Sequence, residues 1–275
     1  MLRKLLTLYL ECLRSLYYED MFYRRDTVPM ASHLTFHWWY QDDLGFWEWL
    51  RTGRGIYWIT GKPGSGKSTL LKHISTDLIR VTKELTKSLE EQMDLYDRPV
   101  IITHFFQHSV SSLPNTVEGL LRSLLWQILC EDVSLFRCIE PIFVQFKRAT
   151  GSCLWTRREL EMGLSSAFRT CRQRLCIFVD ALDEYGGEDA EIAGFLDLLA
   201  KDSPSNVCFC VTSRPYPDFA FQFVNVPTFR IHDHTREDIR VFLQRRFQEV
   251  VARPGRADYY DLMTYIRENS NGVFL

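Results

Sequence analysis

The chain has 275 residues, of which 46% are hydrophobic and 25% are charged. This composition excludes a mainly disordered chain, because enough apolar surface is present to build a core. With 33 Lys and Arg residues against 35 Asp and Glu residues, the formal net charge is -2. Charge therefore gives no reason to expect binding to nucleic acid or to a membrane surface.

The N-terminus and the cysteines indicate a cytoplasmic protein without a membrane span. No apolar run approaches the roughly 20 residues that cross a bilayer. The apolar stretch before Glu11 is too short for a signal peptide and has no small-residue cleavage site behind it. The eight cysteines include no C-x-x-C pair, and Cys176, Cys208 and Cys210 lie in apolar runs, where a thiol acts as a small hydrophobe. We therefore predict reduced core cysteines.

Residues 1–50 are predicted to form a helical and aromatic lead-in. Leucines at helical spacing predict one amphipathic helix over residues 1–25, and a polar stretch with a proline follows at 26–30. The next segment, 33–50, is rich in Phe, Trp and Tyr.

From residue 51 onward, continuous apolar runs alternate with helical patterns. Strands are predicted over 56–60, 100–106, 175–180, 207–212 and 229–231; helices are predicted from Lys67, over 116–130, after the capping box of Thr156 and Glu159, and over 188–201. The charged stretch 77–97 is interpreted as a helical connection or a surface insertion.

This alternation is typical of a parallel sheet with helices on both faces. We therefore predict an α/β fold, a three-layer α/β/α core over residues 51–232. Two further helices, over 235–251 and 258–271, follow without a strand between them. We expect residues 233–275 to be a partial helical domain that is truncated at its end.

The segment after the first predicted strand matches the phosphate-binding pattern G-x-x-x-x-G-K-[ST], the P-loop, so the predicted core is a P-loop NTPase core. It consists of Gly61, Lys62, Pro63, Gly64, Ser65, Gly66, Lys67 and Ser68, and Thr69 follows. The glycines allow the backbone N–H groups to surround a phosphate, and the N-terminus of the following helix adds partial positive charge. We predict that Lys67 reaches the β- and γ-phosphates and that the Ser68 hydroxyl ligates Mg²⁺.

Acidic residues end the third predicted strand. Asp180 follows four apolar residues, and Asp183 and Glu184 come within one further turn. Asp180 is predicted to hold Mg²⁺, directly or through water. Asp183 or Glu184 is predicted to orient and deprotonate a water molecule. Three acids at this place also fit a solvated strand end, but the P-loop favours the functional interpretation.

Arg214 follows the fourth predicted strand directly after Thr212 and Ser213. Ligands of parallel sheets bind at the carboxyl ends of the strands, so we expect Arg214 to face the same crevice as Lys67. A guanidinium there is suited to sensing a γ-phosphate. The alternative is a surface arginine at a strand end.

Together these motifs resemble the NACHT family of signal-transduction ATPases, in the STAND class of P-loop NTPases. The similarity is greatest to fungal incompatibility-type and nephrocystin-like members. Segments 57–70, 178–184 and 212–215 carry the resemblance, and 35–38, 46–50, 119–125 and 271–275 add weaker similarity.

The resemblance implies a molecular switch that holds ADP when closed and ATP when open, and that assembles in its ATP form. By position, residues 61–69 bind phosphates and Mg²⁺, Asp180 supports the metal, Asp183 or Glu184 serves the water, and Arg214 senses the γ-phosphate. The resemblance also implies a preference for adenine, with the aromatic segment 33–49 over the base, and a protein partner or self-assembly.

Three functions remain open at this point. The first is an ATP/ADP-binding switch with slow ATP hydrolysis. The second is an interaction scaffold that holds a nucleotide without significant turnover, which an unfinished helical domain would favour. The third is an unrelated P-loop enzyme such as a small-molecule kinase, although the chain shows no clear basic lid for an acceptor.

Overall fold

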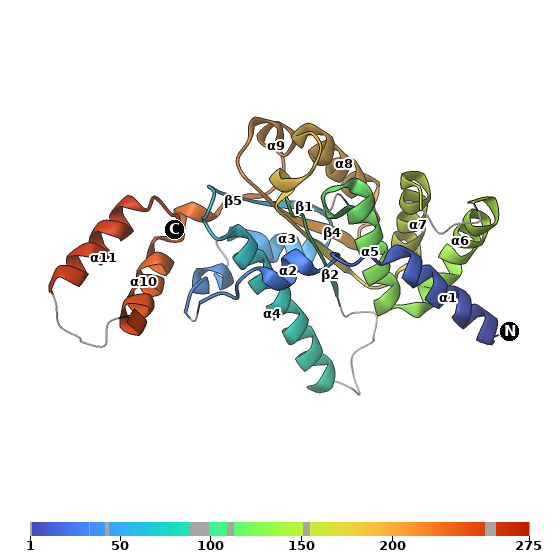
Figure 1. Ribbon diagram of the computed structural model, residues 1–275, viewed down its shortest axis with the longest axis horizontal. Helices are drawn as coiled ribbons and strands as arrows, with labels where there is room; N and C mark the ends of the chain where they lie inside the picture. The colour runs from blue at the N-terminus through green and yellow to red at the C-terminus, as the bar shows by residue number, and fades with distance from the viewer. Residues whose placement is uncertain are drawn as a thin grey trace.

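The centre of the protein is a five-stranded parallel sheet, seen in a computed structural model that describes residues 2–32, 34–41, 44–88, 99–108, 113–150, 155–250 and 257–274 (Figure 1). The strands are β1 (Gly55–Thr60), β2 (Val100–Phe105), β3 (Leu175–Asp180), β4 (Val207–Ser213) and β5 (Thr228–Arg230). Their order is β2-β3-β4-β1-β5, and every neighbouring pair is parallel. The predicted α/β fold class is confirmed.

The strands are buried on both faces of the sheet, as their continuous apolar sequences predict. All residues of β3 and β4 are buried. Along β3, Ile177 and Val179 belong to one hydrophobic cluster, whereas Cys176 and Phe178 belong to another. Alternate residues of a strand point to opposite faces, so the two clusters lie on opposite sides of the sheet and form the two interfaces of a three-layer structure.

The helices divide between these two clusters. The first cluster receives side chains of α1, α5, α7 and α8, and the second receives those of α3 and α4. Their bounds are α1 (Leu2–Leu16), α3 (Phe46–Thr52), α4 (Lys67–Ser88), α5 (Val117–Glu131), α6 (Phe136–Thr150), α7 (Arg157–Thr170), α8 (Asp189–Asp202) and α9 (Pro217–Gln222). Part of the predicted charged connection, 89–97, lies outside the described residues.

The prediction of a single helix over residues 1–25 is wrong. Helix α1 ends at Leu16, and a short second helix, α2, covers Tyr23–Thr27. The guanidinium of Arg122, on α5, donates to the backbone carbonyls of Ser15 (2.8 Å), Leu16 (3.0 Å) and Tyr17 (3.2 Å). These carbonyls lie at the end of α1, where intrahelical donors run out, so a tertiary contact satisfies the helix terminus.

Helix α6 was not predicted from the sequence pattern. Pro141 lies inside it, and proline usually breaks a helix because it lacks an N–H donor. Tertiary packing offsets this cost, since Phe136, Ile139 and Phe143 are buried in the first cluster. The capping box predicted at the start of α7 is present, with the Thr156 side chain accepting from Glu159 N.

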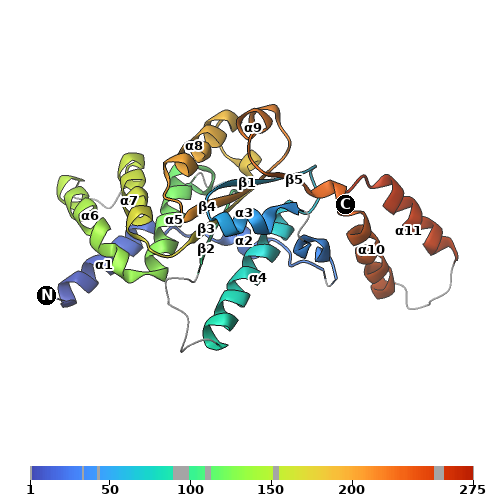
Figure 2. The same ribbon diagram turned by 180° about the vertical axis from the view of Figure 1, so that it is seen from behind.

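The helices α10 (Arg236–Val250) and α11 (Ala257–Asn269) follow the last strand. They form a pair at one end of the molecule, with α1 and α6 at the other (Figures 1 and 2). Both predicted C-terminal helices are therefore present. Within the described ranges, no helix combines the length and apolar character required to cross a bilayer.

Candidate functional site

The glycine-rich loop lies between β1 and α4, as predicted, and its glycines are required by its geometry. Gly64 and Gly66 have φ of 70° and 88°, a left-handed region that side chains disfavour. At Gly61, a Cβ atom would lie 2.4 Å from Ile231 Cγ2. Helix α4 begins at Lys67, so its first N–H groups lie beside the loop and are suited to binding an anion.

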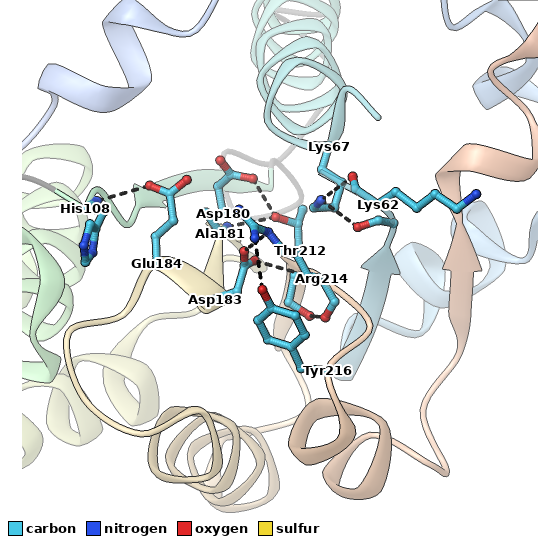
Figure 3. Close-up of polar contacts among 12 residues, drawn as sticks. Lys62, Lys67, His108, Asp180, Ala181, Asp183, Glu184, Thr212, Arg214 and Tyr216 are labelled. Carbon is cyan, nitrogen blue, oxygen red and sulfur yellow. Dashed lines mark hydrogen bonds and ion pairs between the residues drawn. The ribbon is translucent and has the colours of Figure 1, made fainter. Parts of the chain in front are cut away.

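Lys67 folds back over this loop. Its Nζ donates to the carbonyl oxygens of Gly61 (2.8 Å) and Lys62 (3.1 Å), as Figure 3 shows. Burial lowers the pKa of Lys67, and the nearby charges of Asp183 and Asp180 oppose this effect. The ammonium group thus lies near two acids and is held there by two neutral carbonyl oxygens. A charged phosphate oxygen is a stronger hydrogen-bond acceptor and would replace these carbonyls.

Asp180, the last residue of β3, is completely buried. Its Oδ1 accepts a hydrogen bond of 2.6 Å from the Thr212 hydroxyl, whereas its Oδ2 is buried and finds no hydrogen-bond partner within the described part of the chain. Burial raises the pKa of Asp180, and the Ser68 and Thr212 hydroxyls oppose the rise. A buried, unpartnered carboxylate oxygen close to a hydroxyl is the donor set that Mg²⁺ prefers. Asp180 and Ser68 therefore fit the predicted metal.

The chain turns sharply after Asp180. Ala181 has φ of 58° and ψ of 54°, a left-handed conformation that is uncommon for residues other than glycine. Its N–H donates to the Thr212 hydroxyl at 2.9 Å. This turn directs the two following acids, Asp183 and Glu184, toward the end of β4 and the end of β2.

Asp183 is bound to Arg214. Asp183 Oδ2 lies 2.9 Å from Arg214 Nε, and Oδ1 accepts from the Arg214 backbone N–H at 3.0 Å. Only 5% of the Asp183 side chain is exposed. The Arg214 guanidinium also donates to the Tyr216 hydroxyl at 3.0 Å. Asp183 thus orients Arg214, which leaves Glu184 as the better candidate for contact with water.

Glu184 has weaker contacts and greater exposure. Its Oε2 accepts from the His108 backbone N–H at 3.2 Å, and its Oε1 lies 3.4 Å from a terminal nitrogen of Arg24. Its side chain is 26% exposed. These are long contacts for a carboxylate, so Glu184 is held at the edge of the site by partners that it can exchange.

A cavity of about 460 Å³ joins most of these groups, a size in the range of small-molecule sites. Of the predicted residues, its walls include residues 63–69, Asp183, Glu184 and Arg214, but not Gly61, Lys62 or Asp180. A larger cavity, of about 860 Å³, lies along β2. Among the described residues, none of the predicted site residues lines this larger cavity. The cavity of about 460 Å³ is therefore the candidate site.

The cavity also contains residues that the sequence interpretation missed. They are Arg24, Val28, Pro29, Met30, Ser32, Phe242 and Phe274. The sequence pattern predicts a polar stretch over 26–30, although Val28, Pro29 and Met30 within it form an apolar run. Phe242 and Phe274 belong to the C-terminal segment, whose return to the loop no local pattern reveals.

The aromatic segment 33–49 contributes mainly to the core. Trp39, Phe46 and Trp49 are buried in the second cluster together with Tyr57, whereas Thr35 lines the cavity. His33 lies outside the described residues. That this segment covers a base stays a prediction.

The C-terminal segment contacts the loop directly. The Phe274 N–H donates to Gly64 O at 2.8 Å, and Lys62 Nζ donates to Asn271 O at 3.2 Å. On α10, buried Asp238 accepts from Phe36 N at 3.1 Å and from Trp38 Nε1 at 2.6 Å. The helices after the sheet are therefore tied both to the loop and to the segment that precedes it.

The chain was also compared with models of protein families. Residues 35–214 match the family model described as Nephrocystin 3, N-terminal, and this range includes the glycine-rich loop, the acids after β3 and Arg214. A search of curated proteins finds no match to the chain. Because the matched range covers more than half of the sequence, the chain belongs to the nephrocystin 3 N-terminal family.

Proposed function

We propose that this protein binds ATP and ADP with Mg²⁺ and acts as a nucleotide-dependent switch in signal transduction, with slow ATP hydrolysis. One observation carries the proposal: the glycine-rich loop holds Lys67 near the buried Asp180, which has an unpartnered carboxylate oxygen. The family match agrees with a nucleotide-binding domain of the NACHT kind. The preference for adenine and membership of the STAND class, with its fungal relatives, rest on the sequence resemblance.

Different residues at the site would bind different parts of the nucleotide. Backbone N–H groups of the loop and Lys67 would bind the phosphates, and Ser68 and Asp180 would hold Mg²⁺. When bound, Mg²⁺ neutralises charge on the phosphate oxygens. Arg214, oriented by Asp183, would contact the terminal phosphate, and Glu184 would accept a proton from water. The apolar side chains of Val28, Pro29, Met30, Phe242 and Phe274 offer a surface suited to a base.

Switching requires a second element that responds to the nucleotide. The pair α10–α11 is suited to this role, because the Phe274 N–H binds the loop at Gly64 O and the Phe274 side chain lines the cavity. A change at the phosphates would therefore reach these helices through direct contacts. Assembly of the ATP form, as the resemblance implies, would be the consequence.

The test is nucleotide binding by the purified chain, measured with fluorescent ATP and ADP in the presence of Mg²⁺. Lys67→Ala should weaken binding of both. Lys201→Ala is the control, since Lys201 is an exposed lysine on α8 that does not line the cavity. If the wild-type chain binds neither nucleotide, the proposal is wrong.

A second candidate is a scaffold that holds a nucleotide without turnover. It is favoured by the two contacts of Glu184, with Arg24 and with the His108 N–H, which compete with activation of water. Phosphate release by the wild-type chain that disappears in Glu184→Gln would contradict this candidate. Nucleotide binding without phosphate release would support it.

A further inference from the structure

Arg24 is a third cation at the cavity and lies outside the family-matched residues 35–214. It belongs to α2, in the N-terminal segment, and lines the cavity together with Lys67 and Arg214. The sequence pattern predicts only that Arg24 belongs to an amphipathic helix.

The backbone around Arg24 is anchored to the core on two sides. Lys72, on α4, donates to Val28 O at 2.6 Å and to Asp26 O at 3.3 Å. On the other side, the Tyr18 hydroxyl donates to Gly119 O of α5 at 3.2 Å. Because these contacts hold the segment around α2 between α4 and α5, Arg24 has a defined position relative to Lys67 at the start of α4.

The three cations differ in how fully their donors are used. Lys67 donates to two carbonyls, and Arg214 is bound to Asp183 and Tyr216. Among the described residues, Arg24 makes one side-chain hydrogen bond, of 3.4 Å, with Glu184. Its Nε is buried and has no partner within the described chain. Since a guanidinium carries five N–H donors, Arg24 retains most of its donor capacity at the cavity wall.

The unused donors and the positive charge of Arg24 make a phosphate-bearing ligand a suitable partner. Arg24 pairs with Glu184, and its charge also acts on the buried Asp180. A guanidinium forms its strongest hydrogen bonds with phosphate or carboxylate oxygens, two at a time. A terminal phosphate in the cavity would offer Arg24 an acceptor of higher charge than Glu184.

We propose that Arg24 binds the terminal phosphate of a nucleoside triphosphate and gives up its contact with Glu184 in doing so. Glu184 would then be free to accept a proton from water. The N-terminal segment would thus distinguish a triphosphate from a diphosphate. This inference rests on the proposed nucleotide binding.

The experiment compares the full-length chain with Arg24→Ala, Arg24→Lys and Arg25→Ala. Arg25 is the matched control, because it pairs with Asp26 at 3.0 Å, stacks over Phe22 and lines the other cavity. The two probes are ADP and the β,γ-imido analogue of ATP, each with Mg²⁺. The affinity of each variant for each probe is measured by calorimetry.

Arg24→Ala should weaken binding of the ATP analogue by about tenfold or more and binding of ADP much less. Arg24→Lys keeps the charge but not the paired donors, so it should fall between wild type and Arg24→Ala. Arg25→Ala should bind both probes as wild type does. Thermal melting without nucleotide shows whether each variant is folded, and Arg24→Lys provides the comparison if Arg24→Ala melts early.

Equal losses for the two probes, or no loss in Arg24→Ala and Arg24→Lys, would overturn the inference while leaving the proposed function intact. Failure of the wild-type chain to bind either probe would overturn both.

Discussion

Thr212, on β4, donates its hydroxyl proton to Asp180 Oδ1 on the neighbouring strand β3 at 2.6 Å. The same hydroxyl accepts a hydrogen bond from the Ala181 N–H at 2.9 Å. One buried side chain thus fixes the orientation of the acid predicted to hold Mg²⁺ and the left-handed turn that follows it.

Thr212→Val should destabilise the nucleotide-free chain by about 1 to 3 kcal/mol, because it leaves a buried N–H and a buried carboxylate oxygen without their partner. Valine has nearly the shape of threonine, so packing changes little. The measurement is urea denaturation followed by tryptophan fluorescence. Thr212→Ser retains the hydroxyl and is the control; an equal loss in both variants would show that packing, and not hydrogen bonding, matters at this position.

Arg214→Ala should weaken binding of the non-hydrolysable ATP analogue by about tenfold and binding of ADP less. The reason is that a guanidinium at the end of β4 would contact only the terminal phosphate. Asp183→Asn should act in the same direction but more weakly, since asparagine still offers an oxygen to the Arg214 N–H. Tyr216→Phe removes only the hydroxyl contact and serves as the control. Equal losses for both nucleotides in Arg214→Ala would contradict a sensing role.

Local patterns predicted the sheet and the loop well. The strand β3 and its terminal Asp180 were located correctly because a run of buried apolar residues carries its own signal. The loop glycines and Lys67 were equally visible, since their spacing follows from the geometry of a phosphate-sized nest.

The remaining walls of the site depend on contacts between residues distant in sequence. Arg24 and Phe274 both line the cavity of Lys67, yet no short-range periodicity places either one there. The sequence also does not show which of the two neighbouring acids, Asp183 and Glu184, pairs with Arg214, and only the structure gives the contact of Asp183 with Arg214. The aromatic residues around Trp39 gave no signal that separates core packing from base stacking.

Stability should fall at acidic pH because of His104, which is buried on β2. Burial lowers its pKa from 6.5 to about 4. Between pH 6.5 and 4 the unfolded chain binds the proton on His104 more readily than the folded chain does. The free energy of unfolding is therefore at its full value above pH 6.5 and decreases as the pH falls toward 4.

The contribution of His104 to the free energy of unfolding amounts to roughly 3 kcal/mol across that pH interval. The measurement compares the pH dependence of unfolding free energy in wild type and in His104→Leu. The difference between the two curves should change between pH 6.5 and 4 and be flat above pH 7. A constant difference across the whole range would contradict a neutral buried histidine.

Gly272 should determine whether the C-terminal segment stays docked on the glycine-rich loop. It has φ of 81°, and a Cβ atom there would lie 2.2 Å from the backbone oxygen of His232. Gly272→Ala should therefore displace the segment and break the hydrogen bond from the Phe274 N–H to Gly64 O. The readout is hydrogen exchange of the C-terminal peptide, which should accelerate by at least about tenfold.

Gly45→Ala is the matched control for this change, because Gly45 has a similar φ of 67° but open space around the position of a Cβ atom. It carries only the cost of a left-handed alanine, about 1 kcal/mol, and should leave exchange at Phe274 unchanged. If the Phe274 amide exchanges at the same rate in the two variants, the close approach of Gly272 to His232 does not hold the segment on the loop. The link from the loop to α10 and α11 would then have to run through Asp238 and its hydrogen bonds to Phe36 and Trp38 instead.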